Sequence, residues 1–344
     1  MFQLSSAILN RKNNKFEFNK MNRELKLSGF AKYAWFVLAY NIIVILWGAF
    51  LRASLSGDGC GQHWLTCGGE VVPSAPQFKT VIEFSHRLST GLAFFVVLLL
   101  FVWAFRKFAK GDSVRKTAFV SFVLIIVEAL IGAGLVLTGN TAENWTASRP
   151  FWMAAHLITT FSLLAVLTLT GWFAGGGKPF GFNVSRKILV LLSIAVGGIF
   201  LIGMSGSVAA LSSMLFPSTS LAEGIARDFS SASHILLRLR ISHPILSVAG
   251  GTFLMFLAGW LKSQFKENGQ VHRWANVLSV LVLIQFASGA VTLLMHAPIL
   301  MQIIHLLLAD LMWIAFVLLS ANVLAEQIEV ENVSFITATQ SAAR

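Results

Sequence analysis

Charged residues are scarce in this chain. Lys, Arg, Asp and Glu make up only 12% of the 344 residues, whereas a soluble domain is about a quarter charged. Hydrophobic residues reach 56%, and the mean hydropathy is +0.74. The shortage of charge excludes an ordinary soluble domain and predicts a polytopic membrane protein, because the hydrocarbon core of a bilayer accepts few charged groups.

Cysteine is the second shortage, since Cys60 and Cys67 are the only two in the chain. Their C-x6-C spacing is poor for a zinc site, which usually takes closer pairs. Both lie in the glycine-rich stretch SGDGCGQHWLTCGG, which we place in a loop on the outer side of the membrane. Reducing conditions are not maintained there. The pattern favours a disulfide, with a free redox-active pair as the alternative.

Long apolar runs dominate the rest of the chain. A helix needs about 20 apolar residues to cross the hydrocarbon core, and we count eight such runs, at about 33–51, 80–105, 117–138, 150–174, 188–210, 240–260, 274–295 and 299–322. No small-residue cleavage site follows the first run, so we expect a retained helix and not a signal peptide. The predicted fold class is an all-α polytopic membrane protein with eight transmembrane helices.

The positive charge of the chain is distributed unevenly. The formal net charge of +11 would suit nucleic acid, but with the N-terminus inside, the cytoplasmic segments hold 18 Lys and Arg and the outer loops hold six. This asymmetry is the positive-inside bias. It predicts a multi-pass protein of the cell inner (plasma) membrane with cytoplasmic N- and C-termini. Anionic lipid is the expected partner of the basic loops, and no nucleic acid is expected.

The two halves of the chain resemble each other. The matched stretches are FSHRLSTGLAFF (84–95) with ISHPILSVAGGTFLMF (241–256), MAAHLITTFSLLAV (153–166) with MQIIHLLLADLMWIAF (301–316), and LIGAGLVL (130–137) with FASGAVTLL (286–294). Gly48 and Gly203 also precede the first histidine of their halves by 38 and 40 residues. The repeat predicts two pseudo-symmetric four-helix bundles in parallel orientation, related by an axis along the membrane normal.

This repeat also sets the expected domain boundaries. They are a cytoplasmic basic N-terminal tail at 1–32, an N-terminal four-helix bundle at 33–174 with the outer cysteine loop at 52–79, a cytoplasmic linker at 175–187, a C-terminal four-helix bundle at 188–322, and a cytoplasmic C-terminal tail at 323–344.

Four histidines fall within even-numbered apolar runs: His86, His156, His243 and His305. All lie in roughly the first two turns of runs that pass inward, so we expect them at similar depth in the outer half of the membrane. Neutral imidazole is a common iron ligand, and bundle cores hold such cofactors. The pairs therefore predict one haem iron in each half. Buried histidines that bond across helices are the alternative, and the repetition of the pair argues against it.

Arginines near these histidines are candidates for binding haem propionates. Arg52 and Arg87 lie in the first half, and Arg238 and Arg240 lie in the second. The remaining histidines are expected to be solvated or interfacial; they are His63, His234, His272 and His296.

The halves differ in their acidic residues. Glu83 stands three residues before His86, which puts both on one helix face, whereas the matching second-half position is Arg240. A carboxylate near a haem edge can stabilise developing positive charge or accept a proton. The alternative is a helix-end carboxylate favoured by the dipole. Two further acids, Glu128 and Asp310, are expected to make polar contacts between helices.

Taken together, these features resemble those of a known family, the haem A synthases, over roughly residues 33–322. The resemblance rests on GAFLRASLSGDGC running into the C-x6-C loop, on EFSHR, and on the single histidines of the fourth, sixth and eighth runs. The family oxidises the C8 methyl group of haem O to a formyl group, which gives haem A for terminal oxidases. The chain lacks the second cysteine pair of some members and has DGCGQHW where a proline-containing segment is common.

The resemblance implies a role for each candidate residue. His86 and His156 would bind the iron of the substrate haem, and His243 and His305 would bind a haem b cofactor. Glu83 would be the catalytic carboxylate, and Cys60 with Cys67 the first-loop pair of the family. Haem O synthase and a membrane or cytoplasmic electron donor are the implied partners, and a homo-oligomer is compatible with these features.

Two other functions compete with this interpretation. A dihaem b-type membrane electron carrier explains four histidines, but it does not explain why only one half has Glu83 and cysteines. A transporter fits the repeat but gives no reason for paired histidines. Haem O or haem A in the extracted pigments would separate the enzyme from both alternatives.

Overall fold

The structure is a computed structural model that describes residues 27–142, 144, 146–181 and 185–342, with the backbone alone from 326 onward. Its helices are α2 (Gly29–Ala53), α3 (Phe78–Lys107), α4 (Ser113–Leu137), α5 (Arg149–Ala174), α6 (Arg186–Leu215), α7 (Leu221–Phe229), α8 (Ile235–Arg240), α9 (Ser242–Gln264), α10 (Gly269–Leu294) and α11 (Ile299–Ala342). Most of the predicted basic tail, residues 1–26, lies outside the described residues.

Eight stretches of the described chain are long and apolar enough to cross a membrane. They overlap the eight predicted runs, so the all-helical polytopic fold is confirmed. Side-chain caps start several of these helices. Ser28 accepts a hydrogen bond from the backbone N–H of Ala31 at 3.2 Å, and Asp112 accepts one from Val114 at 2.8 Å. Such caps satisfy N–H groups that the first turn of a helix leaves without partners.

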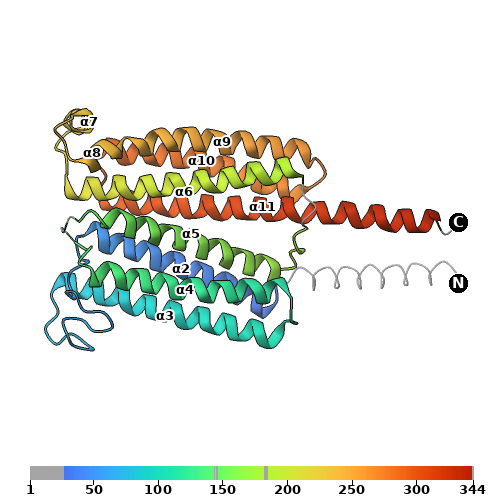
Figure 1. Ribbon diagram of the computed structural model, residues 1–344, viewed down its shortest axis with the longest axis horizontal. Helices are drawn as coiled ribbons and strands as arrows, with labels where there is room; N and C mark the ends of the chain where they lie inside the picture. Colours follow the sequence, from blue (N-terminus) through green and yellow to red (C-terminus); the bar gives the residue numbers. More distant parts are fainter. Residues whose placement is uncertain (1–26, 143, 145, 182–184, 343–344) are drawn as a thin grey trace, which may run out of the picture.

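The helices form two groups of four (Figure 1). In the first group, α2 contacts α3 and α5, and α4 contacts α3 and α5. In the second group, α6 contacts α9 and α11, and α10 contacts α9 and α11. The order of contacts is therefore the same in both groups, which is consistent with the predicted pair of pseudo-symmetric bundles.

Helices α5 and α11 lie where the two groups meet. Helix α5 contacts both α6 and α11, and α2 also contacts α11. Of the 18-residue apolar stretch of each helix, 44% is buried inside the protein in α5 and in α11, whereas only 17% is buried in α4 and 11% in α10. Trp313 of α11 donates its indole N–H to the carbonyl of Phe161 at 2.7 Å, and the two rings stack at 5.9 Å. The groups thus share a buried aromatic contact.

The sixth predicted run is divided in the structure. Helix α8 ends at Arg240, Ile241 forms a turn, and α9 begins at Ser242. Pro244 explains the break, because it has no N–H and its ring would clash with the carbonyl of residue 240 in a continuous helix. The span therefore begins at Ile235 and not at the expected residue 240.

Helix α7 is an element that our sequence analysis did not predict. It lies beside α8, in the connection that follows α6. The signal for it was present, because Ser220 and Glu223 have the S-x-x-E spacing of a capping box. In the structure Ser220 accepts a hydrogen bond from the N–H of Glu223 at 3.2 Å.

The 54–77 loop, which precedes α3, and α7, which precedes α8 and α9, lie at one end of the molecule (Figure 1). We call this the cap end. The C-terminal end of α11 lies at the opposite end, and α11 continues as one helix past residue 322 to Ala342.

Candidate functional site

The four predicted ligand histidines occupy equivalent positions in their spans. His86 is on α3, His156 on α5, His243 on α9 and His305 on α11, and each is between the seventh and the ninth residue of its candidate span. All four spans begin at the cap end (Figure 1). The structure therefore places the four imidazoles at similar distances from that end, as predicted.

In the first half, the imidazole of His86 lies directly against α2. A Cβ atom on Gly48 would come within 2.8 Å of His86 Cε1, so only glycine allows this approach. His86 Nδ1 is buried and has no hydrogen-bond partner among the described residues. An imidazole held against a helix, with this nitrogen free of protein partners, is available to a metal ion.

The other first-half histidine lies beside an acid. Nδ1 of His156 is buried 3.2 Å from a carboxylate oxygen of Glu128 on α4, within ion-pair distance but outside hydrogen-bond geometry. The hydroxyl groups of Thr159 and Thr160, on the same helix as His156, both donate hydrogen bonds to this carboxylate. The expected interhelical role of Glu128 is confirmed by these contacts, and they position its carboxylate at the histidine.

In the second half, the rings of His243 and His305 face each other across the bundle. Their centroids are 6.3 Å apart, and their planes are nearly perpendicular at 88°. Each ring again lies against a glycine: a Cβ on Gly206 would be 2.9 Å from His243 Cε1, and one on Gly289 would be 3.1 Å from His305 Cε1.

The expected counterpart of Gly48 was Gly203, and this was wrong. Gly203 faces Leu157 and Phe161 of α5, while Gly206 contacts the histidine. The two glycines are three residues apart and so share one side of α6. Spacing in the sequence did not show which turn of α6 meets α9.

Hydrogen bonds orient the second-half imidazoles. Nδ1 of His243 is 3.2 Å from the carbonyl oxygen of Ile202, which only an Nδ1–H can satisfy, so Nε2 keeps its lone pair. Nδ1 of His305 is 2.8 Å from the Ser288 hydroxyl, and its Nε2 is 3.2 Å from the Gln285 amide nitrogen. The second pair is thus surrounded by neutral groups.

These pairs fit haem better than a bare metal ion. Among the described residues, no group of three or more His, Cys, Asp and Glu side chains converges on one point. Two imidazoles leave a bare ion short of ligands, whereas a porphyrin supplies four nitrogens of its own and needs only the two axial positions. The glycines beneath three of the rings and the free Nε2 of His243 support the same conclusion.

Glu83 is buried at the start of α3, with only 3% of its surface exposed. One carboxylate oxygen accepts a hydrogen bond from the backbone N–H of Cys60 at 2.8 Å, and the other pairs with the Arg87 guanidinium at 2.5 Å. Arg87 also donates to the carbonyls of His63 and Thr66, at 2.6 and 2.8 Å. Glu83 and Arg87 together attach the cysteine loop to α3.

The cysteine loop is closed by the Cys60–Cys67 disulfide, with Cα atoms 4.3 Å apart. The disulfide prediction is confirmed. Both cysteines are buried, and Thr80 at the start of α3 donates to the carbonyl of Gly59 at 2.8 Å. The loop therefore packs on the N-terminus of α3, three residues before the catalytic candidate Glu83.

The second-half arginines differ in their partners. Arg240, at the position that matches Glu83, pairs with Asp228 of α7 at 2.5 Å and donates to the carbonyl of Gly224 at 3.2 Å. Arg238 is exposed on α8. Arg240 thus attaches α7 to the bundle, as Glu83 attaches the cysteine loop.

Arg149 is a buried charge that our sequence analysis missed. It is 3% exposed at the start of α5 and donates to the carbonyls of Ala142 and Asn144 at 2.8 and 2.6 Å, while its Nε has no partner among the described residues. Arg52 lies at the end of α2, a helix that contacts α5. The signal in the sequence was the Arg-Pro pair that opens the fourth apolar run.

Asp310 does not make the expected contact between helices. It is fully buried on α11, and neither carboxylate oxygen has a hydrogen-bond partner in the described part of the chain. The prediction assumed that a buried acid must be paired. No polar side chain of a neighbouring described helix bonds to it.

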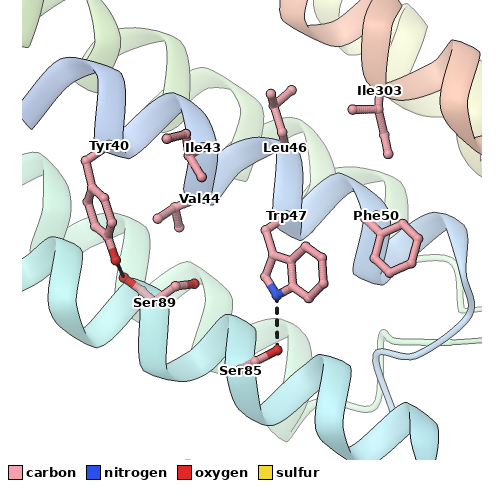
Figure 2. A pocket seen from close by; sticks show the side chains of 9 residues that line it. All are labelled: Tyr40, Ile43, Val44, Leu46, Trp47, Phe50, Ser85, Ser89 and Ile303. Carbon is pink, nitrogen blue, oxygen red and sulfur yellow. Dashed lines mark hydrogen bonds between the residues drawn. The ribbon is translucent and has the colours of Figure 1, made fainter. Parts of the chain in front are cut away.

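A groove of about 470 Å³ lies outside the first bundle, where α2 and α3 approach α11 (Figure 2). Its lining residues are Tyr40, Ile43, Val44, Leu46, Trp47, Phe50, Ser85, Ser89 and Ile303. The polar groups in this lining bond within the protein: Trp47 donates to Ser85 at 3.2 Å, and Tyr40 donates to the carbonyl of Ser89 at 3.0 Å. The groove therefore presents an apolar surface.

Comparison with known proteins gives matches over most of the chain. A family model described as cytochrome oxidase assembly protein matches residues 31–317. The Heme A synthase of Alkalihalophilus pseudofirmus is 28% identical over 283 residues, which cover 80% of this chain and 90% of that protein. The Heme A synthase of Shouchella clausii is 29% identical over 286 residues, with 79% and 89% covered.

A second kind of relative matches with higher identity. A Protoheme IX farnesyltransferase of Thermus thermophilus is 42% identical over 297 residues, which cover 86% of this chain and 49% of that protein. The chain thus spans about half the length of this relative, and its match to the Heme A synthases extends over most of theirs.

Proposed function

The chain belongs to the haem A synthase family of cytochrome oxidase assembly proteins, and from this premise we propose that it oxidises the C8 methyl group of haem O to the formyl group of haem A. The observation that carries the proposal is the pair of imidazoles that His243 and His305 form in the second half, with His86 and His156 at the matching positions of α3 and α5 and acids beside the first-half histidines. An enzyme needs one reactive haem site, and a second site can serve electron transfer.

The two histidine pairs have different roles in this proposal. His86 and His156 hold the substrate haem O, and His243 with His305 holds a haem b cofactor. Haem in these sites supplies the redox chemistry that removes electrons from the methyl group. Overall, the methyl group and one water molecule give a formyl group, four protons and four electrons. A redox partner in the membrane or cytoplasm takes up the electrons.

Glu83 stabilises the positive charge that develops on the methyl carbon. Its carboxylate is buried, and Arg87 and the Cys60 N–H keep it in one orientation. A fixed charge in a water-poor site changes the energy of a transition state by about 3 kcal/mol. The disulfide-closed loop covers this site and limits access of water to it.

Orientation in the membrane follows from the distribution of charge. The 18 Lys and Arg of the cytoplasmic segments and the six of the outer loops favour both termini in the cytoplasm. The cap end, with the cysteine loop and the four histidines near it, then faces the outer side. Haem O synthase is the supplier of substrate, and Arg52 at the end of α2 and Arg149 at the start of α5 are positive charges for propionates in the first half.

Glu83→Gln tests the proposal directly. The amide oxygen of glutamine still accepts the Cys60 N–H, so the loop stays attached, but the negative charge is lost. We expect about 100-fold less conversion of haem O to haem A, with normal haem content, measured in protein coexpressed with haem O synthase. Near-normal haem A production would remove the carboxylate from the mechanism.

Arg87→Met is the matched control for the loop. It removes the bonds to His63 and Thr66 and the ion pair with Glu83, and it keeps the negative charge of the carboxylate. If Glu83 only anchors the loop, Glu83→Gln, which keeps the Cys60 contact, will lose less activity than Arg87→Met. Catalysis by the carboxylate requires the larger loss in Glu83→Gln. Pigment extraction excludes the electron-carrier alternative if haem O or haem A accompanies haem b.

A further inference from the structure

The pair formed by Glu128 and His156 has no equivalent in the described second half. Glu128 on α4 matches Gln285 on α10 in the repeat. The carboxylate of Glu128 lies 3.2 Å from His156 Nδ1, whereas the amide of Gln285 donates to the backbone carbonyl of His305 at 3.2 Å and contacts the other ring nitrogen, Nε2. The two halves thus differ in charge at the same position.

The position of Glu128 is fixed by its neighbours. Its side chain is 15% exposed, and each carboxylate oxygen accepts one threonine hydroxyl, from Thr159 and Thr160. These threonines are three and four residues after His156 on α5, so one helix turn carries both the histidine and the groups that orient its acid. Glu128 is thus held in place beside His156, and among the four candidate ligands His86, His156, His243 and His305 in the described chain, only His156 has a carboxylate within ion-pair distance.

We propose that Glu128 is a positioning residue that accepts the Nδ1 proton of His156, directs Nε2 toward the substrate haem iron, and makes this imidazole a stronger electron donor than the ligands of the second half. A carboxylate behind a ligand histidine fixes its tautomer and raises its basicity. A stronger donor favours the ferric over the ferrous state. This inference rests on the proposed function, because it assumes that His156 binds the substrate haem.

Redox titration of the purified protein tests this role, with and without added haem O so that the two haem sites are resolved. We expect Glu128→Gln to raise the reduction potential of the first-half haem by about 59 mV, which is a tenfold loss of ferric preference for a one-electron couple. The second-half haem in the same sample should be unchanged. Gln285→Glu should lower the potential of the second-half haem.

Glutamine can still accept a hydrogen bond from a threonine hydroxyl. If Glu128 serves only to pack α4 against α5, Glu128→Gln should therefore leave the first-half potential unchanged. An unchanged first-half potential with normal haem content would overturn the proposal. If Glu128→Gln does not fold, Thr160→Val provides the second variant, since it loosens the carboxylate and should shift the potential in the same direction. If instead His156→Ala keeps a normal first-half haem, the ligand assignment itself fails, which is a separate outcome.

The groove between α2, α3 and α11 carries a second inference. Ser85 and Ser89 of its lining flank His86 in sequence, and Trp47 precedes the Gly48 that contacts the His86 ring. Because its hydroxyl and indole groups bond within the protein, the groove offers nothing to a polar head group. We infer that it binds the farnesyl chain of haem O, again on the premise of the proposed function.

Filling the groove tests this assignment. Ile43 is 63% exposed in the groove, and Leu99 of α3 is 52% exposed outside its lining. We expect Ile43→Trp to weaken haem O binding by about tenfold, since the indole ring takes the place of part of the buried apolar chain, and to leave binding of haem b to the same site unchanged. Leu99→Trp is the matched control. Equal effects on both haems, or none, would mean that only bulk lipid occupies the groove.

Discussion

Each histidine of the first half has a carboxylate nearby, whereas the second-half histidines contact neutral groups. Glu83 is one turn from His86, and Glu128 lies 3.2 Å from His156. The matching second-half positions are Arg240 and Gln285. The two halves therefore place their histidines at equivalent helix positions but surround them with different charges.

The caps of the two halves differ in the same manner. In each half, the residue three positions before the first histidine attaches the cap: Glu83 binds the disulfide loop, and Arg240 binds Asp228 of α7. The signs of the charges are opposite, and one cap is covalently closed while the other is a short helix. Glu83 and Arg240 thus occupy matching positions of the repeat and both attach a cap to their bundle, although their charges are opposite.

The strongest test of this comparison removes one histidine from each half. His86→Ala should abolish binding of haem O and leave haem b in place, because the second pair is intact. His243→Ala should do the reverse. Haem content by extraction and optical spectra of each purified variant measure this. A full complement of haem b in His243→Ala, with an unchanged spectrum, contradicts the ligand assignment.

Opening the disulfide should have the next largest effect. The double variant Cys60→Ser/Cys67→Ser should destabilise the loop by about 2–3 kcal/mol, since closure of a short ring restricts the unfolded loop. Conversion of haem O should also fall, because Glu83 and Arg87 lose fixed partners in the loop. Hydrogen exchange of residues 54–77 reports the loosening. Asp228→Asn serves as the comparison, because it should loosen α7 without changing exchange in this loop.

Alanine substitutions at Gly48 and Gly132 should have smaller effects, because each changes the packing at a single point of the first bundle. A Cβ at Gly48 would press on the His86 ring, whereas one at Gly132 would meet no atom within 4 Å. Gly48→Ala should displace the imidazole and lower first-half haem affinity by about tenfold, as loss of ligand support does elsewhere. Gly132→Ala should have no effect on it. Equal affinities in the two variants would show that the ring tolerates displacement.

Hydropathy was sufficient to predict the eight spans, because each membrane helix must satisfy its backbone and expose apolar side chains whatever its neighbours are. The paired histidines followed from the repeat. Contacts between distant segments were not predictable in this way: neither the attachment of Glu83 to Cys60 nor the unpaired state of Asp310 within the described chain is encoded by local spacing. The break at Ile241 was local, and Pro244 signalled it.

The smallest expected effect concerns the cap of α7 and its dependence on pH. Hydrogen bonds from Thr219, first from its hydroxyl and then from its backbone N–H, hold the pKa of Glu223 below its ordinary value of 4.5. A lowered pKa means that the folded state favours the charged carboxylate, so this stabilisation is complete above the ordinary value and is lost as the pH falls through the folded value. The helix should therefore loosen below about pH 4.5.

Hydrogen exchange of residues 221–229, corrected for the intrinsic effect of pH, measures this loosening. Thr219→Val removes the principal hydrogen bond, so its α7 should exchange faster at neutral pH and respond less to acid. Ser220→Ala removes the other cap and should cost about 1 kcal/mol at every pH, because a serine hydroxyl does not titrate. The disulfide loop, closed covalently, should keep its protection in both variants. An α7 in Thr219→Val with the same acid response as the parent protein would contradict the role of Glu223.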